Sequence, residues 1–109
     1  MKPVVFVGAA LDDLRDFPSA ARREAGYQLD RVQRGLEPDD CKPMSDIGAG
    51  VREIRVRDGA GAFRVIYIAA LGDAIYVLHA CQKKTRTTAF HDLDVAARRL
   101  RQISVRRAN

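Results

Sequence analysis

Cationic side chains are concentrated between residues 51 and 88 of the chain. Arg55 lies within EIRVR, Arg64 lies within FRVIYI, and Lys83, Lys84 and Arg86 follow a third apolar segment. Guanidinium and ammonium groups are the usual protein ligands of phosphate. If these three segments are neighbouring strands, their cations would form a concave basic patch suited to a phosphate-containing partner.

The same arginines also have a simpler interpretation. Sheets with one wet face routinely carry charged side chains, and the strand arginines would then be solvent-exposed or paired locally with Glu53 or Asp58. Composition alone favours this second interpretation over a phosphate site.

The sequence offers no motif for proton transfer or for metal binding. His79 lies between apolar residues and is predicted to be structural, while His91 precedes a helix and is expected to help cap it. Cys41 and Cys81 lack the spacing of a zinc site. The acidic pairs fit helix starts and loops better than metal sites; they are Asp12-Asp13, Asp39-Asp40 and Asp92-Asp94. We therefore expect neither a metal nor a cofactor.

Three consecutive strands are expected to position the cations. Alternating or continuous apolar residues predict strands over 51–57, 62–70 and 75–81. Asp58-Gly59-Ala60-Gly61 is typical of a hairpin turn, and Gly72-Asp73 predicts a second turn. Both faces of the third strand are apolar, which predicts a central place in the sheet.

The rest of the chain is predicted to support this sheet. Residues 2–8 are predicted to form an apolar strand with both faces covered. Two helices, 9–17 and 20–34, are predicted to meet at Pro18, and the second begins either with Ser19 as its cap or with Pro18 in its first turn. The apolar stripe of a last helix covers 92–103. Residues 36–50 are predicted to be a long loop, either disordered or lining a functional site.

Size and charge narrow the possible functions. The 109 residues fit one domain, and 47% hydrophobic and 30% charged residues are typical of a soluble globular protein. The formal net charge of +5 favours an anionic partner, most commonly nucleic acid. The first residues lack the length of a membrane span, so we expect a cytoplasmic protein that does not bind a membrane.

The succession of these segments resembles the RelE/ParE toxin superfamily, and within it the phage-derived, HigB-like branch of type II toxin–antitoxin systems. The resemblance rests on VREIRVRDG at 51–59, AFRVIYI at 62–68, IYVLHACQKKTRTT at 75–88 and AARRL at 96–100. It implies a single α+β domain over 1–109 with the RelE-like (bacterial RNase-like) fold. That fold has a mainly antiparallel sheet, an N-terminal helical hairpin and a C-terminal helix.

The resemblance also implies an activity and its partners. Such a toxin is an endoribonuclease that cleaves mRNA on the ribosome by attack of a ribose 2′-hydroxyl, without metal or cofactor. A cognate helix-turn-helix antitoxin would block it. By position, the catalytic cations would be Arg55, Arg64, Lys83 and Lys84. The residues expected to bind RNA are Arg52, Arg57, Tyr67, Arg86 and His91, with Tyr67 better suited to packing than to catalysis.

The family's acid and base have no clear counterparts in this chain. A lysine whose pKa is lowered by neighbouring cations would serve as base, which favours Lys83 or Lys84 over His91. Replacing Arg64 or Lys84 with alanine should then relieve toxicity and leave the fold intact. Two alternatives remain open: a toxin of the same fold that acts on DNA gyrase, and a basic module that binds RNA or protein without catalysis.

Overall fold

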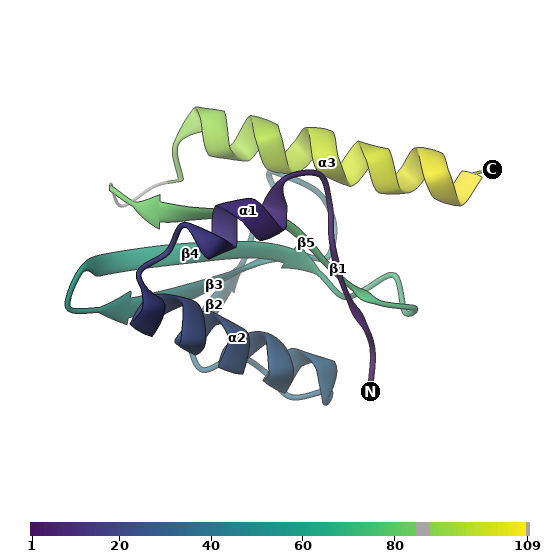
Figure 1. The fold of residues 1–109 in the computed structure, drawn as a ribbon. Coiled ribbons are helices and arrows are strands. Elements are labelled where there is room, and N and C mark those ends of the chain that lie inside the picture. Colours follow the sequence, from purple (N-terminus) through teal and green to yellow (C-terminus); the bar gives the residue numbers. More distant parts are fainter. Residues whose placement is uncertain (85–87, 109) are drawn as a thin grey trace.

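The computed structural model describes residues 1–84 and 88–108, with side chains up to Ile103. It contains one mixed sheet with helices on both faces (Figure 1). The strands are β1 (Val4–Phe6), β2 (Cys41–Pro43), β3 (Val51–Asp58), β4 (Gly61–Ile68) and β5 (Ile75–Lys83). The helices are α1 (Ala10–Arg15), α2 (Ser19–Gln33) and α3 (Phe90–Ala108).

The three strands predicted between residues 51 and 83 form the antiparallel centre of the sheet. The strand order is β1-β5-β4-β3-β2, and only β1 runs parallel to its neighbour. The predicted hairpin turn joins β3 to β4, where the Asp58 carboxylate accepts a hydrogen bond of 2.7 Å from the backbone N–H of Ala60. This register places Arg55 directly opposite Arg64. The predicted α+β class, mainly antiparallel, is confirmed.

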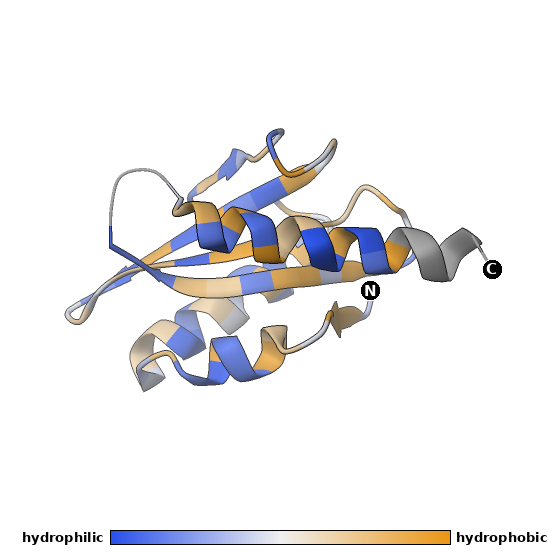
Figure 2. Cartoon of the chain, turned by 90° about the horizontal axis from the view of Figure 1, so that it is seen from above, coloured by the Kyte–Doolittle hydropathy of each residue, from blue (hydrophilic) through white to orange (hydrophobic). Residues whose placement is uncertain are grey.

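Each face of the sheet has its own hydrophobic core. The helical hairpin packs on one face, where Phe17 and Phe63 have ring centroids 4.8 Å apart. On the other face α3 contributes Ala96 and Ile103, and it crosses over the strands with hydrophobic and hydrophilic residues alternating along it (Figure 2). Side chains of successive strand residues therefore face different helices, which separates the polar residues into two groups.

Two predictions about the strands are corrected by the structure. The first strand spans only Val4–Phe6 and lies at an edge, so Val5 is exposed rather than covered. The predicted central strand, β5, lies one place from that edge, and β4 is the middle strand. Because β1 pairs only with Ile75–Val77, the following part of β5 keeps its pairing with β4 but has no partner from β1 on its other edge, and β5 also contacts α1 and α3.

The predicted loop 36–50 contains strand β2, which is antiparallel to β3. Sequence periodicity missed it because it has only three residues and ends in a proline. The buried side chain of Gln28 fixes the preceding segment by accepting a hydrogen bond of 2.8 Å from the backbone N–H of Asp39. Its amide also donates a hydrogen bond of 2.8 Å to the Asp39 carboxylate. This segment is ordered and packed against α2.

The helices extend close to their predicted limits. Pro18, and not Ser19, precedes α2 as its cap residue, and no side chain caps that end. The last helix begins at Phe90 and continues past the predicted end to Ala108. Within the residues that the structure describes, no helix has both the length and the apolar character needed to cross a membrane.

Two glycines test whether the backbone requires glycine at one position and tolerates a side chain at another. Gly50 has a φ of +83°, and a Cβ there would lie 2.8 Å from the Ala70 Cβ. We expect Gly50→Ala to lower the free energy of unfolding by more than about 1 kcal/mol. Gly26 is inside α2, where a Cβ would have no neighbouring atom within 4 Å, so Gly26→Ala should raise it by roughly 0.5–1 kcal/mol. Urea denaturation measures the free energy of unfolding of both variants. Equal effects of the two substitutions would contradict the different backbone requirements of Gly50 and Gly26.

Candidate functional site

A cleft of about 360 Å³ lies where the end of β5 meets the start of α3. The strand alternation places Cys81 and Lys83 on the α3 face, and Arg64 is opposite Cys81 on β4. The residues that line the cleft are Arg64, Cys81, Gln82, Lys83, Lys84, Ala89 and Asp92. Three of the four predicted catalytic cations are therefore at this cleft, together with one carboxylate.

Arg64 forms a buried ion pair with Glu53. Arg64 is 2% exposed and Glu53 is 0% exposed, with 3.4 Å between Nε and Oε1. The hydroxyl of Thr88 accepts a hydrogen bond from Arg64 Nη1 and donates one of 3.0 Å to Glu53 Oε2. The pair thus connects β3 and β4 to the residues that precede α3. The local pairing with Glu53 that the sequence left open is confirmed for Arg64.

Arg55 lies next to the cleft and is held by a carboxylate from the preceding segment. Its Nη2 and Nε donate hydrogen bonds of 2.7 Å and 3.0 Å to the same oxygen of Asp40. The expected partners Glu53 and Asp58 do not take this role. Part of its positive charge is compensated before any phosphate binds.

Lys83 and Lys84 are the lysines of the cleft. Lys83 is partly buried and Lys84 is exposed. Removal from water lowers the pKa of Lys83, and the positive charges of Arg64, Arg57 and Arg55 lower it further. Three predicted cations, Arg64, Arg57 and Arg55, therefore act electrostatically on Lys83.

This environment predicts the titration of Lys83. After reductive methylation with ¹³C-formaldehyde, the dimethylamino signal of Lys83 should titrate at a lower pH than that of a free dimethyl-lysine. The Lys83→Arg variant identifies the signal by its loss. A Lys83 signal that titrates at or above the free value would contradict the cationic environment.

A histidine and two carboxylates form a further polar cluster that the sequence did not predict. His79 is 7% exposed, and its Nε2 lies 2.7 Å from the Asp92 carboxylate. Its Nδ1 lies 3.3 Å from the Asp13 carboxylate. Arg99 donates a hydrogen bond of 2.9 Å to the same Asp13 oxygen and another of 2.9 Å to the Leu78 carbonyl.

The position of this cluster follows from the short first strand. His79 was predicted to be structural because its neighbours are apolar, but it lies beyond the residues of β5 that β1 covers. Its ring therefore reaches α1 on one side and α3 on the other. The i, i+2 spacing of His79 and Cys81 indicated a shared face, whereas nothing in the sequence indicated that Asp92 would join them.

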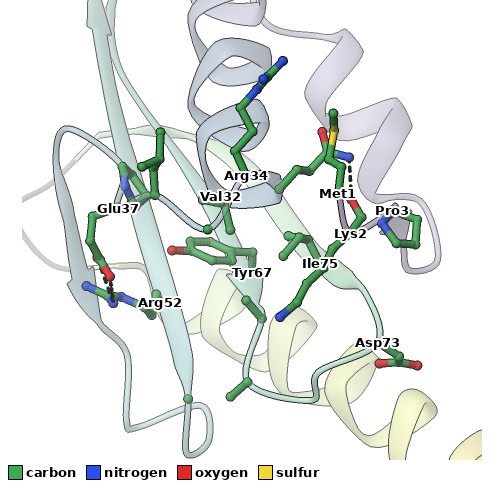
Figure 3. Close-up of a pocket in the computed structure, with 17 residues that line it drawn as sticks. Met1, Lys2, Pro3, Val32, Arg34, Glu37, Arg52, Tyr67, Asp73 and Ile75 are labelled. Atoms are coloured by element: carbon green, nitrogen blue, oxygen red, sulfur yellow. Dashed lines mark hydrogen bonds and ion pairs between the residues drawn. The ribbon is translucent and has the colours of Figure 1, made fainter.

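Arg52 and Tyr67 lie on the opposite face of the sheet. They are cross-strand partners and line an open cavity of about 810 Å³ beside α2 (Figure 3). Arg52 forms an ion pair of 3.1 Å with Glu37, and burial raises the pKa of Tyr67 to about 12. These two predicted RNA-binding residues are thus separated from the cleft by the sheet, and the expectation that Tyr67 packs in the core is confirmed.

The remaining predicted RNA-binding residues are more peripheral. Arg57 is exposed near the end of β3, and His91 is exposed in the first turn of α3 without lining the cleft. Arg86 lies outside the described residues.

Comparison with known proteins places these observations in a family. The sequence pattern of the family described as "Phage derived protein Gp49-like (DUF891)" matches residues 12–101. Among solved structures, the chain is similar to a mutant of the E. coli toxin RelE in the free state, with a TM-score of 0.65 and 14% identity over 94% of this chain and 97% of that one. No curated protein matches. The fold is therefore that of RelE, and the chain belongs to the Gp49-like family of phage-derived proteins, a family of RelE-like toxins.

Proposed function

We propose that this toxin is an endoribonuclease that cleaves mRNA on the ribosome, with the cleft between β5 and α3 as its active site. The observation that carries the proposal is the presence of two lysines and a carboxylate, Lys83, Lys84 and Asp92, around one cleft. Cleavage at a ribose 2′-hydroxyl needs stabilisation of phosphate charge and two proton transfers, and these groups supply both.

The proposed reaction uses no metal or cofactor. Asp92 accepts the proton of the 2′-hydroxyl while its oxygen attacks the adjacent phosphorus atom. The bond from phosphorus to the 5′-oxygen breaks, and the ammonium group of Lys83 protonates that oxygen. The products are a 2′,3′-cyclic phosphate and a 5′-hydroxyl end. Lys84 stabilises the charge on the phosphate oxygens during the attack.

The other side chains of the site have supporting roles in this proposal. His79 holds the Asp92 carboxylate through the 2.7 Å contact. Arg64 acts as a positioning residue, because its guanidinium is buried against Glu53. The lowered pKa of Lys83 favours proton release to the leaving oxygen nearer to neutral pH than an ordinary lysine would allow.

An antitoxin is the partner expected for a member of this toxin family. We propose that it is a helix-turn-helix protein and that both act in the cytoplasm. An acidic segment of the antitoxin would complement the exposed cations Lys84 and Arg57.

Induction of the protein in cells, followed by mapping of mRNA 5′ ends, tests the proposal. We expect new ends within translated messages that disappear with the Asp92→Asn variant, and the purified protein should leave the same messages intact in the absence of ribosomes. Unchanged transcripts in growth-arrested cells would overturn it. A supercoiling assay with purified DNA gyrase then identifies a toxin that acts on gyrase, and salt-sensitive RNA binding without cleavage identifies a non-catalytic module.

A further inference from the structure

Three potential metal ligands converge beside the cleft, two of them, Cys81 and Asp92, in its lining. A nitrogen of His79, the thiol of Cys81 and a carboxylate oxygen of Asp92 all lie within 4.8 Å of one another. We propose that these three groups form a binding site for a divalent ion of the zinc class. This site is additional to the proposed nuclease chemistry, which does not involve a metal.

The ligand set has the composition of an open zinc site. Imidazole, thiolate and carboxylate are the three common zinc ligands, and three protein ligands leave a fourth position for water or another oxygen donor. Cys81 and Asp92 line the cleft, so the fourth position would face Lys83 and Lys84. A zinc ion, one thiolate and one carboxylate together have no net charge, which suits a partly buried site.

Only a small movement is needed to admit the ion. The His79 Nε2 and Asp92 Oδ1 atoms are now 2.7 Å apart and in direct contact. Tetrahedral coordination at ordinary zinc distances places two such ligand atoms about 3.4 Å apart. The three ligand atoms lie within 4.8 Å of one another, so side-chain rotations and shifts of about 1 Å, including one of Asp92 in the first turn of α3, bring them to these separations.

The surroundings of His79 favour coordination through Nε2. When a metal occupies Nε2, the ring proton lies on Nδ1, which is 3.3 Å from the Asp13 carboxylate; this contact lacks hydrogen-bond geometry in the metal-free structure, and a small rotation of the ring would complete it. Carboxylates in this position orient metal-binding histidines in many proteins. Asp13 is fixed in turn by the 2.9 Å hydrogen bond from Arg99. The chain thus supplies both the ligands and the group that orients one of them.

The metal-free site keeps its thiol protonated. Burial and the nearby Asp92 raise the pKa of Cys81 to about 12, while Arg64 opposes this shift. A metal ion that binds must therefore displace the thiol proton. The cations Arg64 and Lys83 also oppose the positive charge of any divalent ion, while the sulfur ligand favours an ion with high affinity for thiolate.

Binding of the ion would have a consequence that rests on the proposed nuclease function. The metal would occupy the Asp92 carboxylate, which then could not accept the proton of the 2′-hydroxyl. Zinc would consequently inhibit RNA cleavage by the toxin.

Cobalt(II) tests the site without any measurement of cleavage. The full chain, treated with a chelator, is titrated with Co²⁺, and we expect a near-ultraviolet thiolate–cobalt absorption band that saturates at one ion per chain. Zn²⁺ should abolish the band by displacement. Cys81→Ser should remove it, whereas Cys41→Ser, which changes the chain's other cysteine, should leave it unchanged.

Two further variants test the assignment of the ligands. Asp13→Asn, which leaves all three ligands in place, should weaken cobalt binding by about 10–100-fold. His79→Gln should remove one ligand and weaken it at least as much, with circular dichroism as the check on folding. Absence of the band in the native chain, or a band that survives Cys81→Ser, would overturn the proposal. Because these readouts need no RNA, a metal-binding chain that leaves mRNA intact would refute the nuclease function alone.

Discussion

Replacement of Arg64 with alanine is expected to destabilise the fold by about 3–5 kcal/mol. The substitution leaves the Glu53 carboxylate, which is 0% exposed, without its cation and, among the described residues, with Thr88 as its hydrogen-bonding partner. An unpaired buried charge is costly because the interior cannot replace its hydration. Urea denaturation of the purified variant measures the effect. The buried pair therefore predicts a different outcome from the sequence-based expectation that Arg64→Ala leaves the fold intact.

A double substitution distinguishes the cost of leaving one buried charge unpaired from the cost of removing the ion pair as a whole. The Glu53→Leu/Arg64→Met variant removes both charges and keeps apolar volume, so it should be substantially more stable than Arg64→Ala alone. Arg57→Ala is the control, since this exposed arginine on the neighbouring strand β3 should change stability by less than about 0.5 kcal/mol. An Arg64→Ala variant as stable as Arg57→Ala would contradict the buried pair. Loss of toxicity at Arg64 consequently cannot be assigned to catalysis.

The second large effect is expected at the lysines of the cleft. Lys84→Ala should lower the rate of cleavage of ribosome-bound message by about 10²–10³-fold, as removal of one transition-state donor does in other enzymes. Because Lys84 is exposed, the free energy of unfolding of the Lys84→Ala variant should stay within about 0.5 kcal/mol of the native value. Single-turnover cleavage assays and urea denaturation on the same preparations measure the two quantities.

Lys83→Arg distinguishes charge from proton transfer. Arginine keeps the positive charge but does not release a proton near neutral pH, so RNA binding should persist while cleavage falls by about 10²–10⁴-fold. Lys2→Arg is the matched control, since Lys2 lines the cavity on the opposite face. Equal cleavage by the Lys83→Arg and native proteins would exclude Lys83 as the proton donor.

The sequence was sufficient for the features that depend on local patterns. The Asp58–Gly61 turn and the alternation of apolar residues determine the β3–β4 hairpin, and hence the pairing of Arg55 with Arg64. The apolar stripes likewise predicted all three helices. These features need only neighbouring residues and the period of each element.

The partners of the charged side chains were not predictable in the same way. Asp40 reaches Arg55 because β2 pairs with β3, and β2 is too short to produce a periodic signal. Asp92 reaches His79 because β1 ends early and α3 begins beside β5. Each contact joins residues from different elements, so it depends on packing that no single segment encodes.

The contact between Asp13 and Arg99 has a consequence for the order of synthesis. These two residues are 86 positions apart, and at about 5–20 residues per second their translation is separated by roughly 4–17 s. During most of that interval β1 and α1 exist without β5, the strand on which both pack. The contacts that join α1, β5 and α3 around His79 consequently form late, after the chain has been synthesised as far as Arg99.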